Sequence, residues 1–271
     1  MTLSEVSPHQ KSNIITLTTD FGLKDSFVGE MKGAILSVNP HVTIVDITHE
    51  IAAHAIDEGA FIIGSSTPHF PEGTIHVAVV DPGVGSERRP IIIETERYCF
   101  VGPDNGLFSS ILSASPSAKV IHITEEKYML DKESATFQGR DMFAPVAGWL
   151  SKGVPPEAFG PVITDYRIIP IPRPVIGKDT LTGEVIYIDR FGNAITNIER
   201  DMLKLLGETV EVFFKGRRIN LFRFYAQATE GELGCLINSS HHLELFIKEG
   251  NAAERFNIKK GEQVVIRKRS P

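Results

Sequence analysis

The sequence predicts an α/β domain with a mostly parallel sheet, followed by a smaller C-terminal β-barrel domain. Apolar, β-branched strands alternate with amphipathic helices in the first part of the chain, whereas short strands fill the last third. A stretch with three prolines, RIIPIPRPVIGK at residues 167–178, separates the two patterns. We therefore expect an N-terminal domain at residues 1–170 and a C-terminal domain at residues 176–271.

The α/β pattern rests on strands that end in polar loops and on helices with regular apolar spacing. Residues 14–19 (IITLTT) are apolar and β-branched, and the helix after them keeps its apolar spacing until Asn39-Pro40 stops it. Asp25 or Ser26 is the expected cap of that helix. In chain order we predict strand 14–19, helix 28–38, strand 43–48, helix 56–66, strands 74–80, 90–94, 97–101 and 119–124, and helix 142–150.

The last third consists of short apolar runs between polar turns, which is typical of a small barrel. Residues 191–193 (FGN) and 238–240 (NSS) are turn sequences, and residues 250–253 (GNAA) open the one helix expected there. The predicted strands are 183–189, 209–214, 217–221, 233–238, 243–247 and 262–266.

Composition bounds the class of protein. The chain has 271 residues, of which 42% are hydrophobic and 23% are charged, so it can bury a globular core. Its net charge of -6 disfavours nucleic acid or an anionic membrane as the main partner. The N-terminus lacks the apolar core of a signal peptide, and no apolar run is long enough to cross a bilayer, so we expect a cytoplasmic protein. Cys99 and Cys235 fall in predicted strands, where packed, reduced thiols are expected.

The loop from Asp81 to Arg88 (DPGVGSER) follows the third predicted strand. Ligands of open α/β sheets bind outside the carboxyl ends of the strands, and Asp81 is placed at such an end. The glycines allow a tight turn, and Arg88 is close enough in sequence to return its guanidinium to the Asp81 carboxylate. A structural turn with a surface ion pair is the alternative interpretation.

Five aspartates occupy loops expected on one side of the first sheet. They suggest either a carboxylate metal site or hydrogen bonding to a hydroxyl-rich ligand such as a ribose diol. The sequence has no Walker-type Gly-Lys-Ser/Thr loop for phosphates. Each aspartate taken singly is more often a helix cap or turn former. The five are Asp20, Asp25, Asp81, Asp104 and Asp141.

Isolated histidines and aromatic residues give weaker signals. His54 and His76 stand singly beside apolar residues and are expected in core or rim positions. Phe191 and Tyr225 could hold an adenine ring between them, although buried packing is the commoner role of such residues.

Six short motifs occur in order along both expected domains. They are TDFG at residues 19–22, DPGVG at 81–85, GPDNG at 102–106, TFQGRD at 136–141, FGNAITN at 191–197 and GNAA at 250–253. In this combination the chain resembles, over nearly its whole length, the S-adenosylmethionine hydroxide adenosyltransferase family, relatives of the 5′-fluorinase and chlorinase. The resemblance implies an α/β domain followed by a β-barrel domain, and a homotrimer with each site between the first domain of one subunit and the second domain of its neighbour.

Carried over by motif, the resemblance also implies the residues of a binding site for S-adenosylmethionine. Asp20 binds the ribose diol, and the second domain holds the methionine and adenosine portions. No cofactor is implied, and we expect no metal because the carboxylates are assigned to hydroxyl and water binding. The implied substrate-binding residues are Asp20, Asp25 and His54 in the first domain and Asp189, Phe191, Asn193, Ser239, Asn251 and Ala252 in the second.

The family's hydrolytic members use an Asp, Arg and His set. By motif it maps to Asp81, Arg88 and the residue between Phe137 and Gly139, which here is Gln138. The implied reaction is displacement at ribose C5′ by water, giving adenosine and methionine. Asp81 orients the water and takes or relays its proton, Arg88 stabilises the hydroxide-like charge, and Gln138 can hold a water but cannot be its base.

Three other functions stay open from the sequence. The first is a halide-using adenosyltransferase, which Asp81 disfavours because a carboxylate repels a halide, and for which Gly139 offers no hydroxyl donor. The second is a trimeric binding protein for S-adenosylmethionine or adenosine that has lost turnover together with its histidine. The third is a metal-dependent hydrolase.

Overall fold

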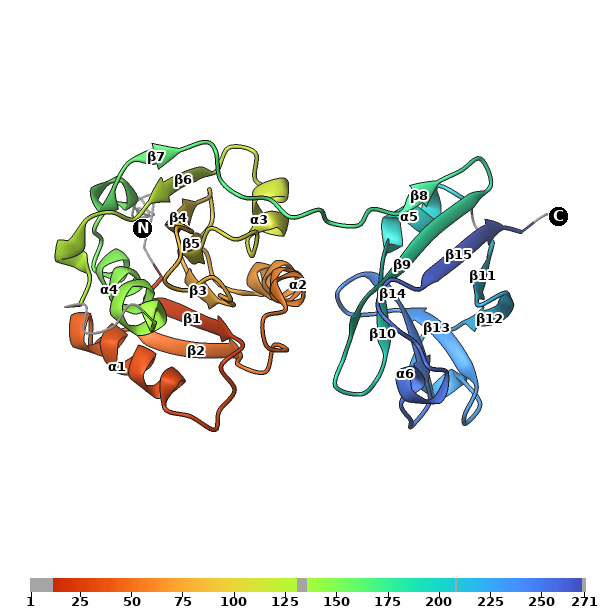
Figure 1. Cartoon of the computed structure of the whole chain (residues 1–271). Helices are drawn as coiled ribbons and strands as arrows, with labels where there is room; N and C mark the ends of the chain where they lie inside the picture. Colours follow the sequence, from red (N-terminus) through yellow and green to blue (C-terminus); the bar gives the residue numbers. More distant parts are fainter. Residues whose placement is uncertain (1–11, 131–135, 208, 270–271) are drawn as a thin grey trace, which may run out of the picture. The chain divides into compact units, whose positions relative to one another are not determined.

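The computed structural model describes residues 12–130, 136–207 and 209–269 (Figure 1). The chain forms two compact units, Met1–Pro170 and Ile171–Pro271. We call them the α/β unit and the barrel unit and describe each by itself.

The α/β unit is built on a sheet of seven strands. In chain order these are β1 (Ile14–Thr19), β2 (Thr43–Thr48), β3 (Ile75–Val79), β4 (Pro90–Glu94), β5 (Cys99–Pro103), β6 (Lys119–His122) and β7 (Val162–Ile163). Their order across the sheet is β2-β1-β3-β5-β4-β6-β7. The first four strands in this order pair in parallel, and the remaining pairs are antiparallel.

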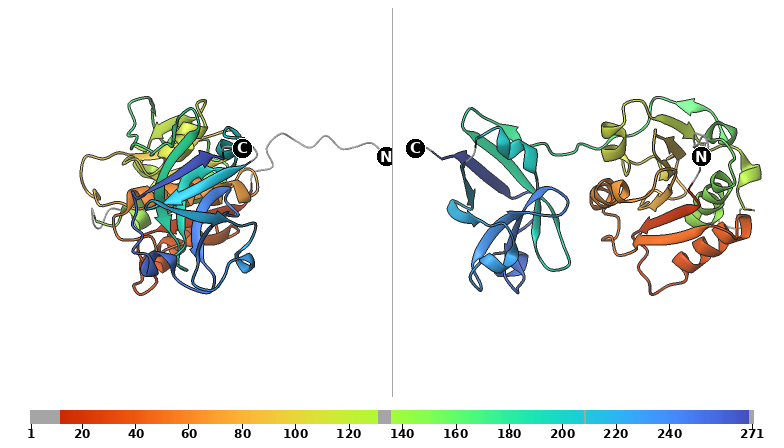
Figure 2. Two further views of the ribbon diagram at one scale, coloured as in Figure 1. Left: turned by 90° about the vertical axis from the view of Figure 1, so that its right-hand side faces the viewer. Right: turned by 180° about the vertical axis from the view of Figure 1, so that it is seen from behind.

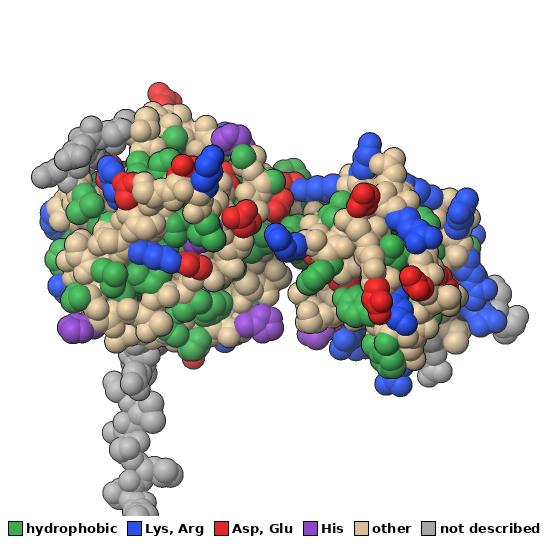
Figure 3. Space-filling view, turned by 90° about the horizontal axis from the view of Figure 1, so that it is seen from below, with side chains coloured by type: hydrophobic (Ala, Val, Ile, Leu, Met, Phe, Trp, Pro, Cys, Tyr) green, Lys and Arg blue, Asp and Glu red, His purple; other side chains and the backbone are tan. Residues whose placement is uncertain are grey.

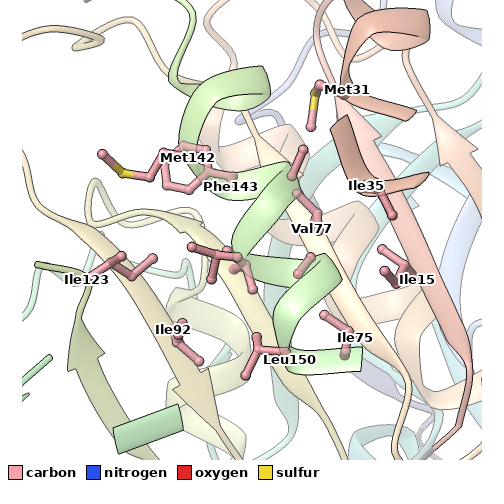
Figure 4. Packing of buried hydrophobic residues seen from close by; sticks show 14 of the residues in the cluster. Ile15, Met31, Ile35, Ile75, Val77, Ile92, Ile123, Met142, Phe143 and Leu150 are labelled. Atoms are coloured by element: carbon pink, nitrogen blue, oxygen red, sulfur yellow. The ribbon is translucent and has the colours of Figure 1, made fainter. Parts of the chain in front are cut away.

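Helices cover both faces of this sheet (Figures 1 and 2). The helices and short turns are α1 (Phe27–Val38), α2 (Ile56–Ser66), η1 (Thr67–His69), α3 (Ser109–Ala114), η2 (Glu126–Tyr128), η3 (Gly139–Phe143), α4 (Ala144–Ser151) and η4 (Pro156–Phe159). Side chains of a strand alternate between the two faces, so Val77 of β3 packs with α1 and α4 while its neighbour Ala78 packs with α2 and α3. Figure 4 shows the first of these layers, with Ile35 of α1 next to Val77 and Leu150 of α4 next to Ile75.

The parallel strands bring the predicted loops to one edge of the sheet. β1, β3 and β5 run in the same direction, and Thr19 at the end of β1 lies in register with Val79 at the end of β3. The residues that follow, Asp20 after β1 and Asp81 after β3, therefore leave the sheet at neighbouring positions.

The barrel unit contains a closed barrel of seven strands. Its strands and helices are β8 (Val175–Ile176), β9 (Thr180–Ile188), β10 (Ala194–Glu199), α5 (Arg200–Lys204), β11 (Val210–Phe214), β12 (Arg217–Leu221), η5 (Tyr225–Gln227), β13 (Leu233–Ile237), β14 (His242–Ile247), α6 (Ala252–Arg255) and β15 (Gln263–Lys268). The sheet order β10-β14-β13-β12-β11-β15-β9 closes because β9 also pairs with β10, while β8 extends β9 on the outside. The predicted fold class is confirmed.

The barrel unit contains elements that were not predicted from the sequence. β8 lies in the proline-containing segment that separates the two patterns, β10 is an additional strand, and α5 adds a second helix where one was expected. The β10 sequence AITNIE does not show the apolar alternation of a strand because it contains polar residues that are buried in the fold. Their side chains bond to backbone groups: Thr196 Oγ1 donates to the Leu243 carbonyl at 2.8 Å, and Asn197 Oδ1 accepts from Glu184 N at 2.8 Å.

Cys99, which is half-buried, and Cys235, which is buried, are not joined in a disulfide, as expected for thiols packed in strands. Within the described ranges, each helix is too short or too polar to cross a membrane.

Candidate active site

Asp81 and Arg88 form a buried ion pair in the loop that follows β3. Arg88 Nε donates to both carboxylate oxygens of Asp81 at 2.9 Å, and Arg88 Nη2 donates to Asp81 Oδ2. Only 4% of the Asp81 side chain and 7% of the Arg88 side chain are exposed. The interpretation as a surface ion pair is therefore wrong, because this pair has been withdrawn from water.

The loop itself returns Arg88 to Asp81. Val84 N donates to the Asp81 carbonyl at 3.2 Å and Ser86 N donates to the Gly83 carbonyl at 3.0 Å, which folds the chain through two successive turns. Gly85 lies at φ 79°, a left-handed conformation that favours glycine.

Gln138 joins this pair from a distant part of the chain. It immediately precedes η3, a π-helical turn that leads into α4, and its Oε1 accepts from Arg88 Nη2 at 2.5 Å. The Gln138 side chain makes no capping bond to the turn. Because a guanidinium can only donate, the amide oxygen must face Arg88, which leaves the two N–H groups of Gln138 Nε2 for another partner.

Arg88 retains one unused nitrogen. Its guanidinium lies over the ring of Phe143, with Cζ 5.4 Å from the ring centroid. Nη1 is buried and has no hydrogen-bond partner among the described residues. A buried cationic N–H without an acceptor is costly, so Nη1 is a donor that a water or an anionic group can satisfy. Sequence reasoning missed Phe143, which lies five residues after Gln138 at the end of η3.

Asp20 and His54, two residues implied to bind the substrate, meet at the exit of β1. Asp20 Oδ2 accepts from the backbone N–H of His54 at 2.9 Å. His54 is exposed at φ 67°, so it lies on the rim and not in the core. Asp25 is exposed in the loop before α1, and neither it nor Ser26 caps that helix: Ser26 Oγ instead donates to Glu30 Oε1 at 2.6 Å.

A buried histidine that sequence reasoning missed supports the Asp20 loop. His49 Nδ1 lies 2.8 Å from Thr19 Oγ1, and the His49 carbonyl accepts from Gly22 N at 2.7 Å. On its other side, His49 Nε2 lies 3.1 Å from Asp46 Oδ1. The contact with the TDFG motif on a neighbouring parallel strand was not visible in the sequence.

Two of the five loop aspartates are engaged in the framework of the α/β unit. Asp104 accepts from Arg89 Nη2 at 2.8 Å and from the backbone of Arg167 at 2.7 Å. Asp141 does not cap a helix but lies inside η3, where its Oδ1 accepts from Arg140 Nε at 2.6 Å. Both carboxylates are thus satisfied by arginine.

In the barrel unit, Asp189 organises the turn that carries Phe191 and Asn193. Asp189 Oδ1 accepts from Phe191 N at 2.9 Å and from Asn193 N at 2.8 Å, and Oδ2 accepts from Asn193 Nδ2 at 3.1 Å. Asn193 is buried, whereas 76% of Phe191 is exposed. The expectation that Phe191 packs inside the chain is wrong, because the turn holds the ring away from the core.

The turn that carries Asn251 packs against the Asp189 turn. Ala253 N donates to the Gly192 carbonyl at 2.8 Å, and a side chain at Gly192 would collide with Asn251. Asn251 Oδ1 caps α6 by accepting from Glu254 N at 2.8 Å, and Ala252 is fully buried. The structure therefore brings Asp189, Phe191, Asn193, Asn251 and Ala252 together.

Ser239 and Tyr225 occupy separate segments of the barrel unit. Ser239 is exposed in the turn between β13 and β14. Tyr225 is 45% exposed, and its hydroxyl donates to Glu244 Oε1 at 2.7 Å. Its expected burial is therefore only partial.

Of the two histidines predicted in core or rim positions, His76 lies in the core. It is 2% exposed on β3, as expected for a core position. Residues 12–130, 136–207 and 209–269 contain no group of three or more His, Cys, Asp or Glu side chains placed to hold a metal ion.

The fold and this arrangement define a class of protein: an α/β unit with a buried Asp-Arg-Gln set at its strand ends, joined to a β-barrel unit with aromatic and amide groups at its turns. Residues 15–160 match the SAM hydroxide adenosyltransferase N-terminal domain, and residues 183–265 match the SAM hydroxide adenosyltransferase C-terminal domain. The chain belongs to the SAM hydroxide adenosyltransferase family.

Its relatives extend over both units. A protein of Methanocaldococcus jannaschii named (R)-S-adenosyl-L-methionine hydrolase is 36% identical, over 94% of this chain and 95% of the relative. A fluorinase of Nocardia brasiliensis is 28% identical, over 94% of this chain and 96% of the relative. The crystal structure of an uncharacterized conserved protein from Thermotoga maritima superposes with a TM-score of 0.87 at 33% identity, covering 93% of this chain and 99% of that chain.

Proposed function

We propose that this protein hydrolyses S-adenosyl-L-methionine to adenosine and L-methionine. The relatives that share about a third of its sequence along nearly its whole length carry the name of that activity. The observation in this chain that carries the proposal is the buried Asp81–Arg88–Gln138 set, which leaves donors free for a water at the strand ends.

The reaction is an in-line displacement at C5′ of the ribose. A water oxygen bonds to C5′ as the C5′–S bond breaks, and the bonding electron pair returns to sulfur, so methionine leaves as a neutral thioether without needing an acid. The water proton passes to Asp81 or through it to solvent. Positioning of the water opposite the breaking bond can contribute about 7 to 11 kcal/mol in favourable cases.

The three residues of the set then have distinct roles. Arg88 Nη1 and the Nε2 group of Gln138 are donors that can hold the oxygen of the attacking water as negative charge develops on it. Asp81 is a poor base because both of its oxygens already accept from Arg88. Gln138 cannot take a proton at all, so we propose that this enzyme is slow compared with relatives that have histidine at this position.

The binding residues follow the same assignment. Asp20 binds the ribose diol, with Asp25 and His54 beside it. Asp189, Phe191 and Asn193 hold the methionine and adenosine portions, and Ser239, Asn251 and Ala252 meet the adenine. Their grouping into one set at the exit of β1 and another at the turns of the barrel unit supports this division.

We further propose that the two units act as domains, residues 1–170 and 176–271, and that three chains assemble so that the α/β unit of one subunit and the barrel unit of its neighbour share each site. Charge supports this pairing. The α/β unit contains 12 Lys and Arg against 21 Asp and Glu, whereas the barrel unit contains 16 against 13. Lys and Arg are prominent on the barrel unit in Figure 3. Opposite net charges favour association of the two kinds of unit.

We place the protein in the cytoplasm.

Product analysis tests the activity. Purified protein is incubated with S-adenosyl-L-methionine in water enriched in oxygen-18, with and without added chloride. The products are separated by chromatography, and their masses are measured by mass spectrometry. We expect equal amounts of adenosine and methionine, with the heavy oxygen in adenosine. A halogenated adenosine would identify a halide-using enzyme, and bound but unchanged substrate would identify a binding protein; either result would overturn the proposed hydrolysis.

A further inference from the structure

Glu244 is a buried acid that the proposed reaction does not use. It lies on β14, whose residues Leu243 and Leu245 point into the barrel, so Glu244 points outwards. A cover formed by Phe222 and Ala228 packs on this outer face, and Glu244 is only 3% exposed beneath it. No Lys or Arg in the described part of the chain forms an ion pair with Glu244.

Both oxygens of Glu244 accept hydrogen bonds from neutral groups. Oε1 accepts from the Tyr225 hydroxyl at 2.7 Å, and Oε2 accepts from Asn238 Nδ2 at 3.0 Å. A carboxylate only accepts, so it fixes the orientation of the Asn238 amide: Nδ2 faces Glu244, and Oδ1 faces the turn.

That orientation holds the turn that carries Ser239. Asn238 Oδ1 accepts from Ser240 N and from His242 N, each at 3.0 Å. The turn places His241 at φ 65°, a conformation that costs free energy for a residue other than glycine and persists only where the surroundings enforce it. The hydrogen bonds to Asn238 Oδ1 help to hold this conformation, and Glu244 fixes the orientation of the Asn238 amide.

The second bond holds Tyr225. This residue begins the short helix η5, and its ring lies edge-on against Phe246 with centroids 4.9 Å apart. Glu244 therefore ties two exposed segments of the barrel unit, at Tyr225 and at Ser239, to one buried point on β14.

A second carboxylate lies near enough to act on Glu244. Burial first, and then the charge of Asp189, raise the pKa of Glu244, against the hydrogen bonds from Tyr225 and Asn238. Burial and the hydrogen bond to Glu244 raise the pKa of Tyr225, and the charge of Asp189 raises it further. Asp189 accepts hydrogen bonds from backbone and amide groups, so among the described residues no cation bonded to either acid balances the negative charge of the two.

We infer that Glu244 is a positioning and specificity-determining residue: it holds Ser239 and Tyr225 in place, and its charge favours the cationic substrate over the neutral nucleoside product. This inference rests on the proposed function. S-adenosylmethionine carries a sulfonium and an ammonium against one carboxylate, a net charge of +1, whereas adenosine is neutral. A buried negative charge thus stabilises the bound substrate and not the bound adenosine.

Charge and geometry are separated by two substitutions. Glu244→Gln keeps the length of the side chain and an acceptor for Asn238, and its amide can donate to the Tyr225 oxygen, but it removes the charge. We expect KM for S-adenosylmethionine to rise about 5- to 10-fold, kcat to stay within about twofold, and the Kd of adenosine to stay within about twofold. Glu244→Asp keeps the charge but shortens the side chain, so it is expected to weaken substrate and adenosine by the same factor.

The matched control is Glu232→Gln. Glu232 also lies in the barrel unit, and it accepts from Asn220 Nδ2 at 2.7 Å. It lies in the connection between β12 and β13, whereas Glu244 lies on β14. We expect its KM, kcat and adenosine Kd to match the parent protein. Thermal melting of each variant establishes that it is folded.

The outcomes separate this inference from the proposed function. If Glu244→Gln leaves KM unchanged, or weakens substrate and adenosine equally, the charge has no selective role. If Glu244→Gln does not fold, Asn238→Ala decides the positioning role: unchanged adenosine binding in that variant overturns it, and weaker binding supports it. A parent protein that neither binds nor turns over S-adenosylmethionine refutes the proposed function instead.

Discussion

The amide oxygen of Gln138 lies 2.5 Å from Arg88 Nη2, and the same nitrogen donates to Asp81, so one guanidinium nitrogen links an acid and an amide that stand 57 positions apart in the chain. This link fixes which face of the Gln138 amide is free. It also decides what a histidine in the same place would do, because an imidazole could accept from Arg88 with one nitrogen and use the other near the substrate.

Gln138→His is expected to raise turnover and to introduce a dependence of kcat on pH near neutrality. An imidazole of ordinary pKa, about 6.5, can accept the water proton in this range, whereas the amide cannot. The parent enzyme is expected to change little in rate between about pH 6 and 8. Gln138→Ala is expected to lower turnover because the water loses a donor. Steady-state kinetics across this pH range measure all three proteins.

The control for this prediction is Gln263→His, which places the same residue at an exposed position on β15. It should leave rate and pH profile unchanged. If Gln138→His and Gln138→Ala also matched the parent protein, Gln138 would not belong to the catalytic set.

Asp81→Asn is expected to lower kcat about 100-fold or more. The amide keeps the size of the side chain but cannot take a proton, and its nitrogen faces Arg88 donors in place of one oxygen. Asp165→Asn is the control, because Asp165 also pairs with an arginine, Arg89, yet is 79% exposed. Near-parental turnover of folded Asp81→Asn protein would remove Asp81 from the mechanism.

Hydrolysis is expected to continue in EDTA. Three carboxylates that could have formed a metal site instead accept from arginine: Asp81 from Arg88, Asp104 from Arg89, and Asp141 from Arg140. Their oxygens are committed to these ion pairs. Rates are measured before and after dialysis against EDTA, and again after magnesium is added. Loss of activity that magnesium restores would contradict this prediction.

Mixed subunits are expected to regain activity. If each site draws Asp81 from one chain and Asn193 from another, then inactive Asp81→Ala and inactive Asn193→Ala proteins, exchanged with each other, form some sites with both residues intact. Activity after mixing is compared with that of each variant alone, and light scattering gives the oligomeric state. A fully active monomer would exclude the shared site.

His76 is expected to make the free energy of unfolding depend on pH. Burial lowers the pKa of His76 to about 3, among the rings of Phe70, Tyr98 and Phe100 and 2.7 Å from Thr16 Oγ1. The unfolded chain binds a proton at this residue below about pH 6.5, whereas the native chain does not until about pH 3. Stability from this residue is therefore present above pH 6.5 and is lost as pH falls through this window.

The size of this loss is at most about 1.4 kcal/mol per pH unit. The free energy of unfolding is measured in urea at pH 7, 6 and 5 for the parent protein and for His76→Gln. Because the other titrating groups are common to both proteins, the difference between the two free energies gives the contribution of His76. The difference in unfolding free energy is expected to shrink by up to about 2 kcal/mol between pH 7 and 5. A constant difference would show that His76 titrates alike in both states.

The sequence by itself determined the fold class and the order of the loops. The period of the apolar residues distinguishes the α/β unit from the barrel, and Asp81 and Arg88 are close enough in the chain for their pairing to be predicted. Turn sequences such as FGN and GNAA predict where the backbone reverses, because their conformational requirements are local. β10 was not predicted because its buried polar side chains form their hydrogen bonds with neighbouring strands, which the sequence does not show.

Only the tertiary structure decided which of the predicted residues meet. The orientation of the Gln138 amide is set by Arg88, which the sequence places 50 residues away, and the burial of that pair depends on the packing of η3 and Phe143 over it. His49 contacts Thr19 from the segment after a neighbouring strand, and Glu244 contacts Asn238 across a turn. These contacts likewise depend on the tertiary structure. Local preferences extend over a few residues, so contacts between distant segments follow from how the sheet and the barrel close.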